Sequence, residues 1–104
     1  MAVTFRLEIA TPERLVIRED VTEAQIPAKR GELGVRPEHA PLIAELGIGV
    51  LSYVSDGRRR EMSVGGGVVE VLPDRTRVLA DYLDDLGIVC FFWFLAAALW
   101  HSSQ

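Results

Sequence analysis

The fold class is decided by residues 50–64, Val50-Leu51-Ser52-Tyr53-Val54-Ser55-Asp56-Gly57-Arg58-Arg59-Arg60-Glu61-Met62-Ser63-Val64. Apolar and β-branched residues are frequent at both ends of this stretch, and Asp56-Gly57 stands in the middle. An Asp-Gly pair between two such runs favours a short β-hairpin turn, because both residues tolerate positive φ. We therefore predict two antiparallel strands, over residues 50–54 and 60–64.

Further short strands are expected on both sides of this hairpin. Residues 4–9 alternate between polar and apolar, which places Phe5, Leu7 and Ile9 on one face of a strand. Turn residues separate the other expected strands, at 14–18, 21–26, 32–35, 42–46, 68–72 and 76–80. Many short strands with a turn signal every few residues, and no helical period among them, predict a small all-β sandwich or barrel.

Length and composition limit the class of protein. A chain of 104 residues has room for one domain, and 49% hydrophobic with 25% charged residues is ordinary for a globular protein. The net charge of −4 argues against a nucleic-acid partner, because proteins that bind nucleic acids usually carry a basic face.

The charges are distributed unevenly along the chain. All the Asp, Glu, Lys and Arg residues lie within residues 1–85, and residues 86–104 have none. We therefore predict a sandwich domain over 1–85 and a short, apolar, helical C-terminal tail over 86–104, with Asp84 or Asp85 capping the start of the helix. A helix over 86–100 reaches about 22 Å, less than the roughly 30 Å of a hydrocarbon core.

Three explanations of this tail stay open. It is a short apolar anchor or partner helix, an unrelated extension of a sandwich, or the product of a shifted reading frame. We favour the last two together, because the apolar run has no basic flank of the kind that membrane anchors carry.

No group of residues has the pattern of a catalytic, metal or cofactor site. Ser63 lacks the sequence of a nucleophile elbow, and His39 and His101 lack partners at metal-ligand spacing. The glycines at 65–67 are not followed by the Lys-Ser/Thr of a phosphate loop. The single Cys90 cannot form an internal disulfide. The residues alone therefore predict a non-catalytic interaction module.

Several motifs together resemble one family. They are an opening strand over residues 4–12, Gly-Glu-Leu-Gly-Val at 31–35, His-Ala-Pro-Leu at 39–42, Gly-Gly-Val-Val-Glu-Val at 66–71 and Val-Leu-Ala-Asp at 78–81. In order and spacing, over residues 4–81, this set resembles the epsilon subunit of the proton-translocating ATP synthase.

The resemblance implies a ten-stranded, two-sheet β-sandwich and a non-catalytic subunit of the rotating central stalk. Such a subunit links the gamma subunit to the membrane c-ring and so couples proton flow to ATP synthesis. It needs no cofactor or metal, and the complex holds it at the cytoplasmic side of the bacterial inner membrane as a peripheral protein. The alternative is a stand-alone β-sandwich protein-binding module that is tethered by its apolar tail.

The resemblance also implies a c-ring contact through Gly31, Glu32, Leu33 and His39. Glu32 is the main candidate, since a carboxylate accepts strong hydrogen bonds from polar groups on the ring loops. His39 either contacts the partner or satisfies its own loop. Two departures from the family pattern add charge beside this contact, namely Glu38 in place of a usual Gly and the basic Lys29. The tail does not resemble the family's helical hairpin, so regulation and nucleotide binding are not expected.

Overall fold

The structure is a computed structural model that describes residues 3–87, with side chains described as far as residue 84. All regular elements in this part are strands. They are β1 (Phe5–Thr11), β2 (Arg14–Val21), β3 (Glu23–Ala28), β4 (Gly31–Val35), β5 (Leu42–Glu45), β6 (Gly49–Ser55), β7 (Arg58–Val71) and β8 (Arg75–Gly87). The all-β sandwich that the strand pattern predicts is confirmed at this level.

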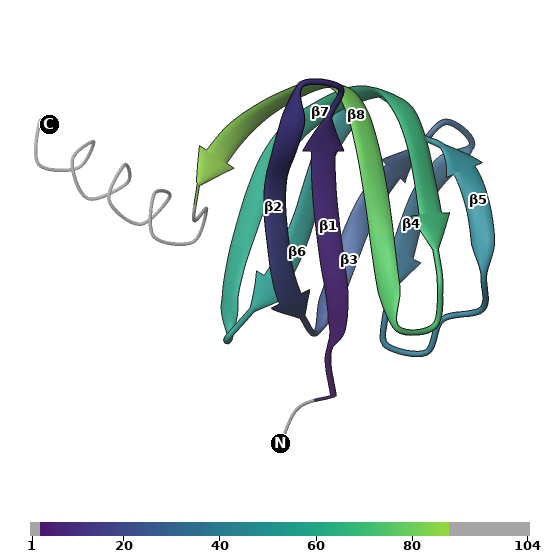
Figure 1. The fold of residues 1–104 in the computed structure, drawn as a ribbon, viewed down its shortest axis with the longest axis vertical. Helices are drawn as coiled ribbons and strands as arrows, with labels where there is room; N and C mark the ends of the chain where they lie inside the picture. Colours follow the sequence, from purple (N-terminus) through teal and green to yellow (C-terminus); the bar gives the residue numbers. More distant parts are fainter. Residues whose placement is uncertain (1–2, 88–104) are drawn as a thin grey trace, which may run out of the picture.

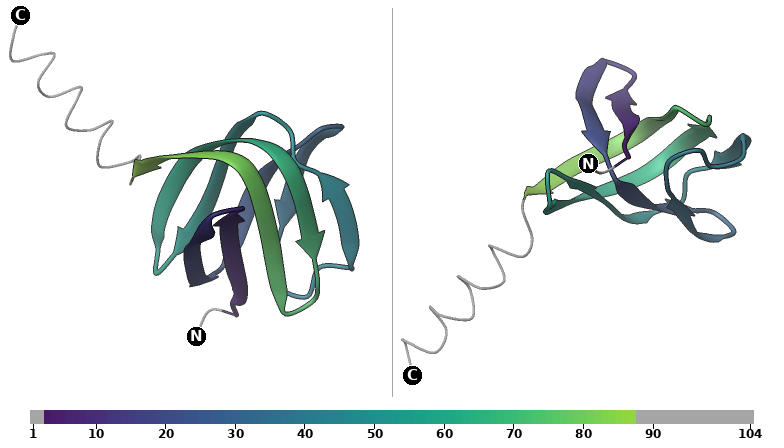
Figure 2. Two further views of the ribbon diagram at one scale, coloured as in Figure 1. Left: turned by 45° about the horizontal axis from the view of Figure 1, so that its top comes forward. Right: turned by 90° about the horizontal axis from the view of Figure 1, so that it is seen from below.

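The strands form two layers that share β7 and β8. The first layer has the order β2-β1-β8-β7-β5 and lies in front in Figure 1, while β6, β3 and β4 lie behind it. In the second layer, β6 pairs with residues 58–64 of β7, whereas β5 of the first layer pairs with residues 68–71. β7 and β8 therefore pass from one layer to the other, as the rotated views of Figure 2 show.

The strand count differs from the expected ten. Residues 3–87 contain eight strands. The sequence pattern predicts nine, and one is lost because residues 60–64 and 68–72, expected as separate strands, belong largely to the single strand β7. The glycines at 65–67 bend this strand without ending it. The expected helix start at Asp84 or Asp85 is also wrong, because both residues are paired with β7 inside β8. Residues 88–104, most of the predicted tail, lie outside the described residues.

The bend in β7 depends on glycine. Gly66 has a φ of +68° and Gly67 a φ of +117°, and L side chains rarely adopt either conformation. A Cβ on Gly67 would overlap the backbone carbonyl oxygen of Leu79 in β8. The absence of a side chain at Gly67 therefore allows two things at once. Residues 67–71 pair with β8, and β7 bends from one layer into the other.

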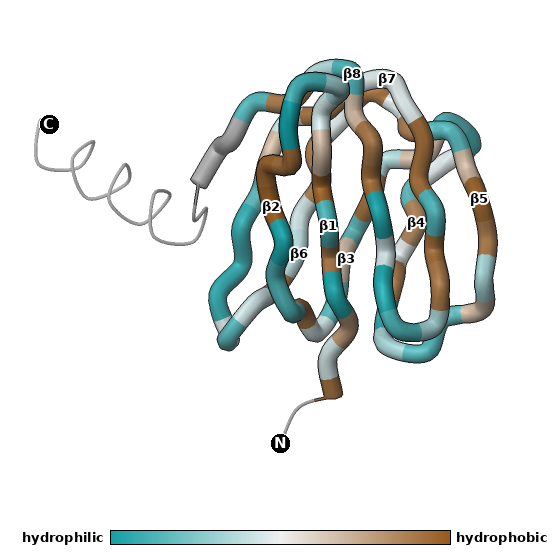
Figure 3. The backbone as a smooth tube through the Cα atoms, viewed as in Figure 1, coloured by the Kyte–Doolittle hydropathy of each residue, from teal (hydrophilic) through white to brown (hydrophobic). Residues whose placement is uncertain are grey.

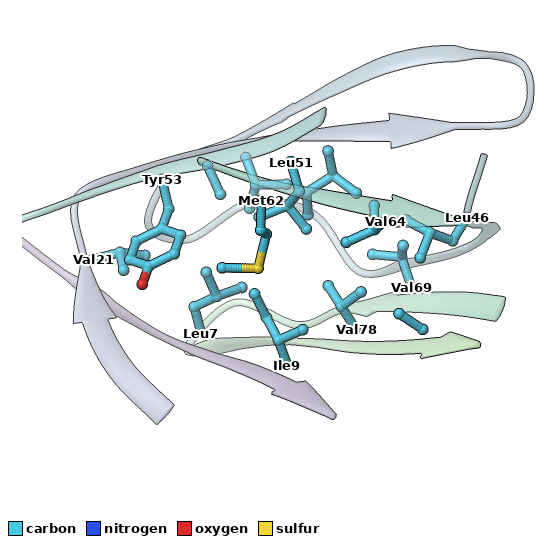
Figure 4. Close-up of a cluster of buried hydrophobic side chains, with 14 of the residues drawn as sticks. Leu7, Ile9, Val21, Leu46, Leu51, Tyr53, Met62, Val64, Val69 and Val78 are labelled. Carbon is cyan, nitrogen blue, oxygen red and sulfur yellow. The ribbon is translucent and has the colours of Figure 1, made fainter. Parts of the chain in front are cut away.

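The core lies between the layers and follows the period-two pattern. Phe5, Leu7 and Ile9 of β1 are all buried, as their alternation predicts. Leu7 and Ile9 face Met62 and Leu51 of the second layer across the core (Figure 4). Each fully buried side chain of this kind contributes about 1.5–3 kcal/mol to stability, so this shared interior holds the layers together.

The hairpin at Asp56-Gly57 forms as predicted. Asp56 has a φ of +56° and Gly57 a φ of +74°, the two positive values that a two-residue turn of this kind needs, and Ser55 pairs with Arg58. The strands expected at 50–54 and 60–64 pair in antiparallel register within β6 and β7.

Candidate interaction surfaces

The hairpin of β3 and β4 presents three of the four predicted c-ring residues. Gly31 follows the turn at a φ of +131°, and a side chain in its place would meet nothing within 4 Å, so the conformation alone favours glycine. Glu32 is exposed and has no hydrogen bond or ion pair within residues 3–87. Leu33 packs against the core and anchors the strand. The hairpin thus holds out a free carboxylate on a fixed backbone.

A salt bridge fixes the tip of this hairpin to β5. The Lys29 backbone N–H donates to the Glu45 carbonyl at 3.0 Å, and its ammonium lies 3.2 Å from the Glu45 carboxylate. The basic Lys29 is therefore engaged by Glu45 of its own chain. Because both side chains are about 70% exposed, the pair adds little stability and mainly positions the tip.

His39 lies in the loop between β4 and β5. Its Nδ1 lies 2.7 Å from the Ala40 carbonyl oxygen, so this nitrogen carries the proton and donates. The backbone N–H of Glu38 donates to the Pro73 carbonyl at 2.9 Å, which ties the loop to the turn between β7 and β8. His39 was expected either to contact a partner or to satisfy its own loop, and the structure shows the contact within the loop. The Nε2 atom is left for another contact.

The structure separates His39 from the other three predicted residues. Gly31 begins β4, and the His39 loop follows the opposite end of this five-residue strand, about 13 Å away at the usual rise per residue. In Figure 1 the β3–β4 hairpin is at the top and the loop after β4 is at the bottom. One small patch of a partner therefore cannot contact Glu32 and His39 together.

The outer face of the first layer is the second candidate surface. One row is apolar across β2, β1, β8 and β7, and we call it the apolar row; on β5 its neighbour is Glu45. Its members are paired neighbours in the order Leu15, Ala10, Leu79 and Val68. Leu15 is 52% exposed and Leu79 is 44% exposed, unusually high values for large apolar side chains that lie together. They line a shallow hollow that Ile43 of β5 also borders.

A second row on this face carries alternating charges, and we call it the charged row. Its members are Arg18, Glu8, Arg77 and Glu70, again direct neighbours across β2, β1, β8 and β7. Figure 3, in the view of Figure 1, shows hydrophilic and hydrophobic positions alternating along these strands. The sequence shows this alternation within each strand, but no local pattern indicates which outward residues meet across strands.

The other sequence features lie within strands or outside the described residues. Among residues 3–87 no three His, Cys, Asp or Glu side chains are placed to hold a metal ion. Ser63 lies in the middle of β7, and residues 65–67 form a strand bend. Residues 3–87 contain no helix that is long and apolar enough to cross a membrane. Cys90 and His101 lie outside the described residues.

Bacterial epsilon chains of ATP synthase are among the proteins similar to this chain. An epsilon chain of ATP synthase from Solibacter usitatus is 58% identical over 81 residues, which are 78% of this chain and 60% of that protein. An epsilon chain from Koribacter versatilis is 47% identical over 81 residues, 78% of this chain and 57% of that protein. This chain therefore aligns with about three fifths of the length of these relatives.

Two solved structures share the fold at low sequence identity. A chain in the mitochondrial ATP synthase of Euglena gracilis matches 83% of this chain with a TM-score of 0.76 and 19% identity, over 56% of its own length. A chain in the central stalk and c-ring structure of Tetrahymena thermophila matches 81% with a TM-score of 0.66 and 15% identity, over 68% of its length.

The family model for the β-sandwich domain of the ATP synthase delta/epsilon chain matches residues 4–83. These limits contain seven of the eight strands completely, and β8 as far as Leu83. Both candidate surfaces lie within the matched residues. The chain belongs to the ATP synthase delta/epsilon family and carries that family's β-sandwich domain.

Proposed function

We propose that this chain is a non-catalytic subunit of the central stalk of a rotary ATP synthase, where it links the gamma subunit to the membrane c-ring. The observation that carries the proposal is the match of residues 4–83 to the family's β-sandwich domain. The similar epsilon chains come from bacteria, which favours a peripheral position at a bacterial membrane. The cytoplasmic side of that membrane is part of the proposal. The subunit would transmit torque and, with it, couple proton flow to ATP synthesis.

The gamma subunit is proposed to bind the outer face of the first layer. This face offers an apolar hollow in which Leu15, Leu79 and Val68 are partly exposed. Burying such side chains is the main source of affinity in protein interfaces, and the flanking charged row can set the orientation of the partner. A subunit that transmits torque needs a broad contact of this kind, since a single loop would bend under load.

The c-ring is proposed to contact the β3–β4 hairpin through Gly31, Glu32 and Leu33. The Glu32 carboxylate is exposed and unpaired within residues 3–87, so it is available to polar groups on the ring loops. His39 stays part of the proposal, as a separate contact through Nε2 from the other end of β4. The alternative of a tethered module depends on residues 86–104 and stays a prediction.

Two variants of Glu32 in the assembled synthase test the c-ring contact. Glu32→Gln keeps the size and one acceptor oxygen, whereas Glu32→Ala removes both oxygens. We expect Ala to lower ATP-driven proton pumping more than Gln, with ATP hydrolysis unchanged. Asp74→Asn, an exposed carboxylate in the turn between β7 and β8, is the matched control. Full pumping in both Glu32 variants contradicts this assignment.

A binding experiment tests the gamma contact separately. Leu79→Asp places a charge in the apolar row, and Val50→Asp places one on a similarly exposed apolar residue of β6 in the second layer. We expect only the Leu79 variant to lose capture by immobilised gamma subunit. Equal capture of both variants would move the gamma contact elsewhere, and no capture of the unaltered chain would favour the tethered module.

A further inference from the structure

We propose that the outer face of the first layer also binds the same face of a second copy of this chain. The two copies are related by a twofold axis that runs along the strands, between β1 and β8. This inference goes beyond the stalk function and does not depend on it. It follows from the charge order across the four strands β2, β1, β8 and β7.

The charged row is complementary to itself when it is reversed. Across the four strands it reads Arg18, Glu8, Arg77, Glu70, that is, positive, negative, positive, negative. A twofold axis between β1 and β8 reverses this order in the second copy. Arg18 then faces Glu70 of the second copy, and Glu8 faces Arg77 of the second copy, so that every charge in the row meets its opposite.

The same axis also superposes the two apolar rows. Leu15 faces Val68 of the second copy, and Ala10 faces Leu79 of the second copy, since these residues are the strand neighbours in the next outward row. One row thus supplies apolar burial and the other supplies orientation. Both rows lie on the same shallow hollow, whose lining includes Ala10, Leu79 and Val68.

The two central charges of the row form an ion pair within the single chain, whereas the two end charges have no ion-pair partner in the described part of the chain. In the single chain, Arg77 Nε lies 3.3 Å from a Glu8 carboxylate oxygen, so the central pair is already formed. Around the axis, two such pairs would make a closed ring of four alternating charges. Arg18 and Glu70 have no ion pair or hydrogen bond within residues 3–87, and the second copy supplies a partner for each.

Two other arrangements of the same two faces are disfavoured by their charges. An axis along β8, the central strand of the layer, would place Glu8 against Glu70 and Arg77 against its own copy. An axis across the strands would lay the charged row on the apolar row and bury unpaired charges. In the proposed dimer, Arg6 of the next outward row faces Arg75 of the second copy, which are like charges. Two aspartates offset this repulsion, because Asp20 lies 4.0 Å from Arg6 and Asp74 lines the same shallow pocket.

The area of the face predicts a weak dimer. Four strands spaced about 4.8 Å apart and about seven residues long cover roughly 450 Å² per copy, or roughly 900 Å² in total. This lies below the roughly 1,200–2,000 Å² of stable specific complexes, so we expect a dissociation constant of roughly 10–100 µM. Because the gamma subunit is proposed to bind the same face, the dimer would be a form of the unassembled chain.

Charge exchange in the full 104-residue chain tests this dimer by sedimentation equilibrium, over about 5 to about 500 µM protein. Arg18→Glu and Glu70→Arg each place like charges opposite each other at both ends of the row. We expect either change to weaken the dimer at least about tenfold. The double variant Arg18→Glu/Glu70→Arg restores opposite charges at both ends, and dimerisation should return toward that of the unaltered chain.

A matched reversal separates this contact from effects of net charge. Asp84→Arg makes the same change of charge as Glu70→Arg, but on an exposed residue of β8 in the second layer, and should leave the dimer intact. Circular dichroism of each variant checks that it is folded. A monomer at all concentrations, association that neither single reversal weakens, or a double variant that stays monomeric each overturns the proposal. Capture of the unaltered chain by the gamma subunit tests the stalk function separately, whichever of these outcomes is found for the dimer.

Discussion

The two layers of the sandwich are joined in two different ways. At one place β7 and β8 simply continue from one layer into the other, through the bend at residues 65–67. At the other, β2 and β6 meet through hydrogen bonds, in which the Tyr53 hydroxyl donates to a Glu19 carboxylate oxygen at 2.6 Å and the Thr22 N–H donates to the Val54 carbonyl at 2.9 Å. We call these the continuous joint and the hydrogen-bonded joint.

The difference lies in what each joint demands of the sequence. The continuous joint demands the absence of a side chain, and nothing can replace glycine where a neighbouring carbonyl fills the space. The hydrogen-bonded joint requires particular polar groups from distant parts of the chain. Tyr53 and Glu19, for example, are 34 residues apart. Loss of one hydrogen bond there leaves the others, which include the Ser55 hydroxyl donating to the Asp20 carbonyl at 2.9 Å.

The largest effect is expected from Gly67→Ala in the continuous joint. The new Cβ would overlap the Leu79 carbonyl, and the φ of +117° is itself unfavourable for alanine. We expect the free energy of unfolding to fall by at least about 3 kcal/mol, or the chain to fail to fold. Urea denaturation of the full chain, followed by far-ultraviolet circular dichroism, measures this change.

Gly57→Ala separates crowding from backbone conformation. Gly57 also has a positive φ, +74°, but no atom lies within 4 Å of the position that its Cβ would take. This variant should lose only about 1 kcal/mol, the usual penalty for the left-handed conformation. Equal losses in the two variants would show that crowding against β8 is not what makes Gly67 necessary.

A smaller loss is expected from Tyr53→Phe in the hydrogen-bonded joint. Tyr53 is 1% exposed, and its hydroxyl donates to a charged acceptor, so the loss should be about 1–2 kcal/mol. Tyr82→Phe removes a hydroxyl from a side chain that is 53% exposed and should change stability by less than about 0.5 kcal/mol. If both variants unfold at the same urea concentration as the unaltered chain, the Tyr53–Glu19 bond does not stabilise this joint.

The two joints also explain which features could be predicted from the sequence. The Asp56-Gly57 hairpin and the buried face of β1 depend on neighbouring residues, and both are confirmed. The length of β7 was not predictable, since glycines that bend a strand look like glycines that end one. The rows on the outer face depend on pairing between distant residues, such as Glu8 with Arg77. The resemblance to the family likewise grouped His39 with Glu32, although β4 separates them.

The smallest change in stability is expected at Glu38. This residue has a positive φ in an open loop, and so it contrasts with Gly67, which has a positive φ in a crowded position. Glu38 has a φ of +64°. The chain therefore tolerates a side chain in the left-handed conformation where the loop is open, at a cost of about 1 kcal/mol, whereas Gly67 has no such freedom. Glu38→Gly should remove this cost but add flexibility to the unfolded chain, for a net gain of about 0.5 kcal/mol.

Glu38→Ala is the matched control, because it removes the carboxylate and keeps the strained φ. We expect it to leave the free energy of unfolding within about 0.3 kcal/mol of the original value, since Glu38 is exposed. A gain with alanine equal to that with glycine would show that charge, and not backbone strain, disfavours Glu38. The positive φ would then carry little cost in this loop, and the necessity of glycine at residue 67 would be due to crowding alone.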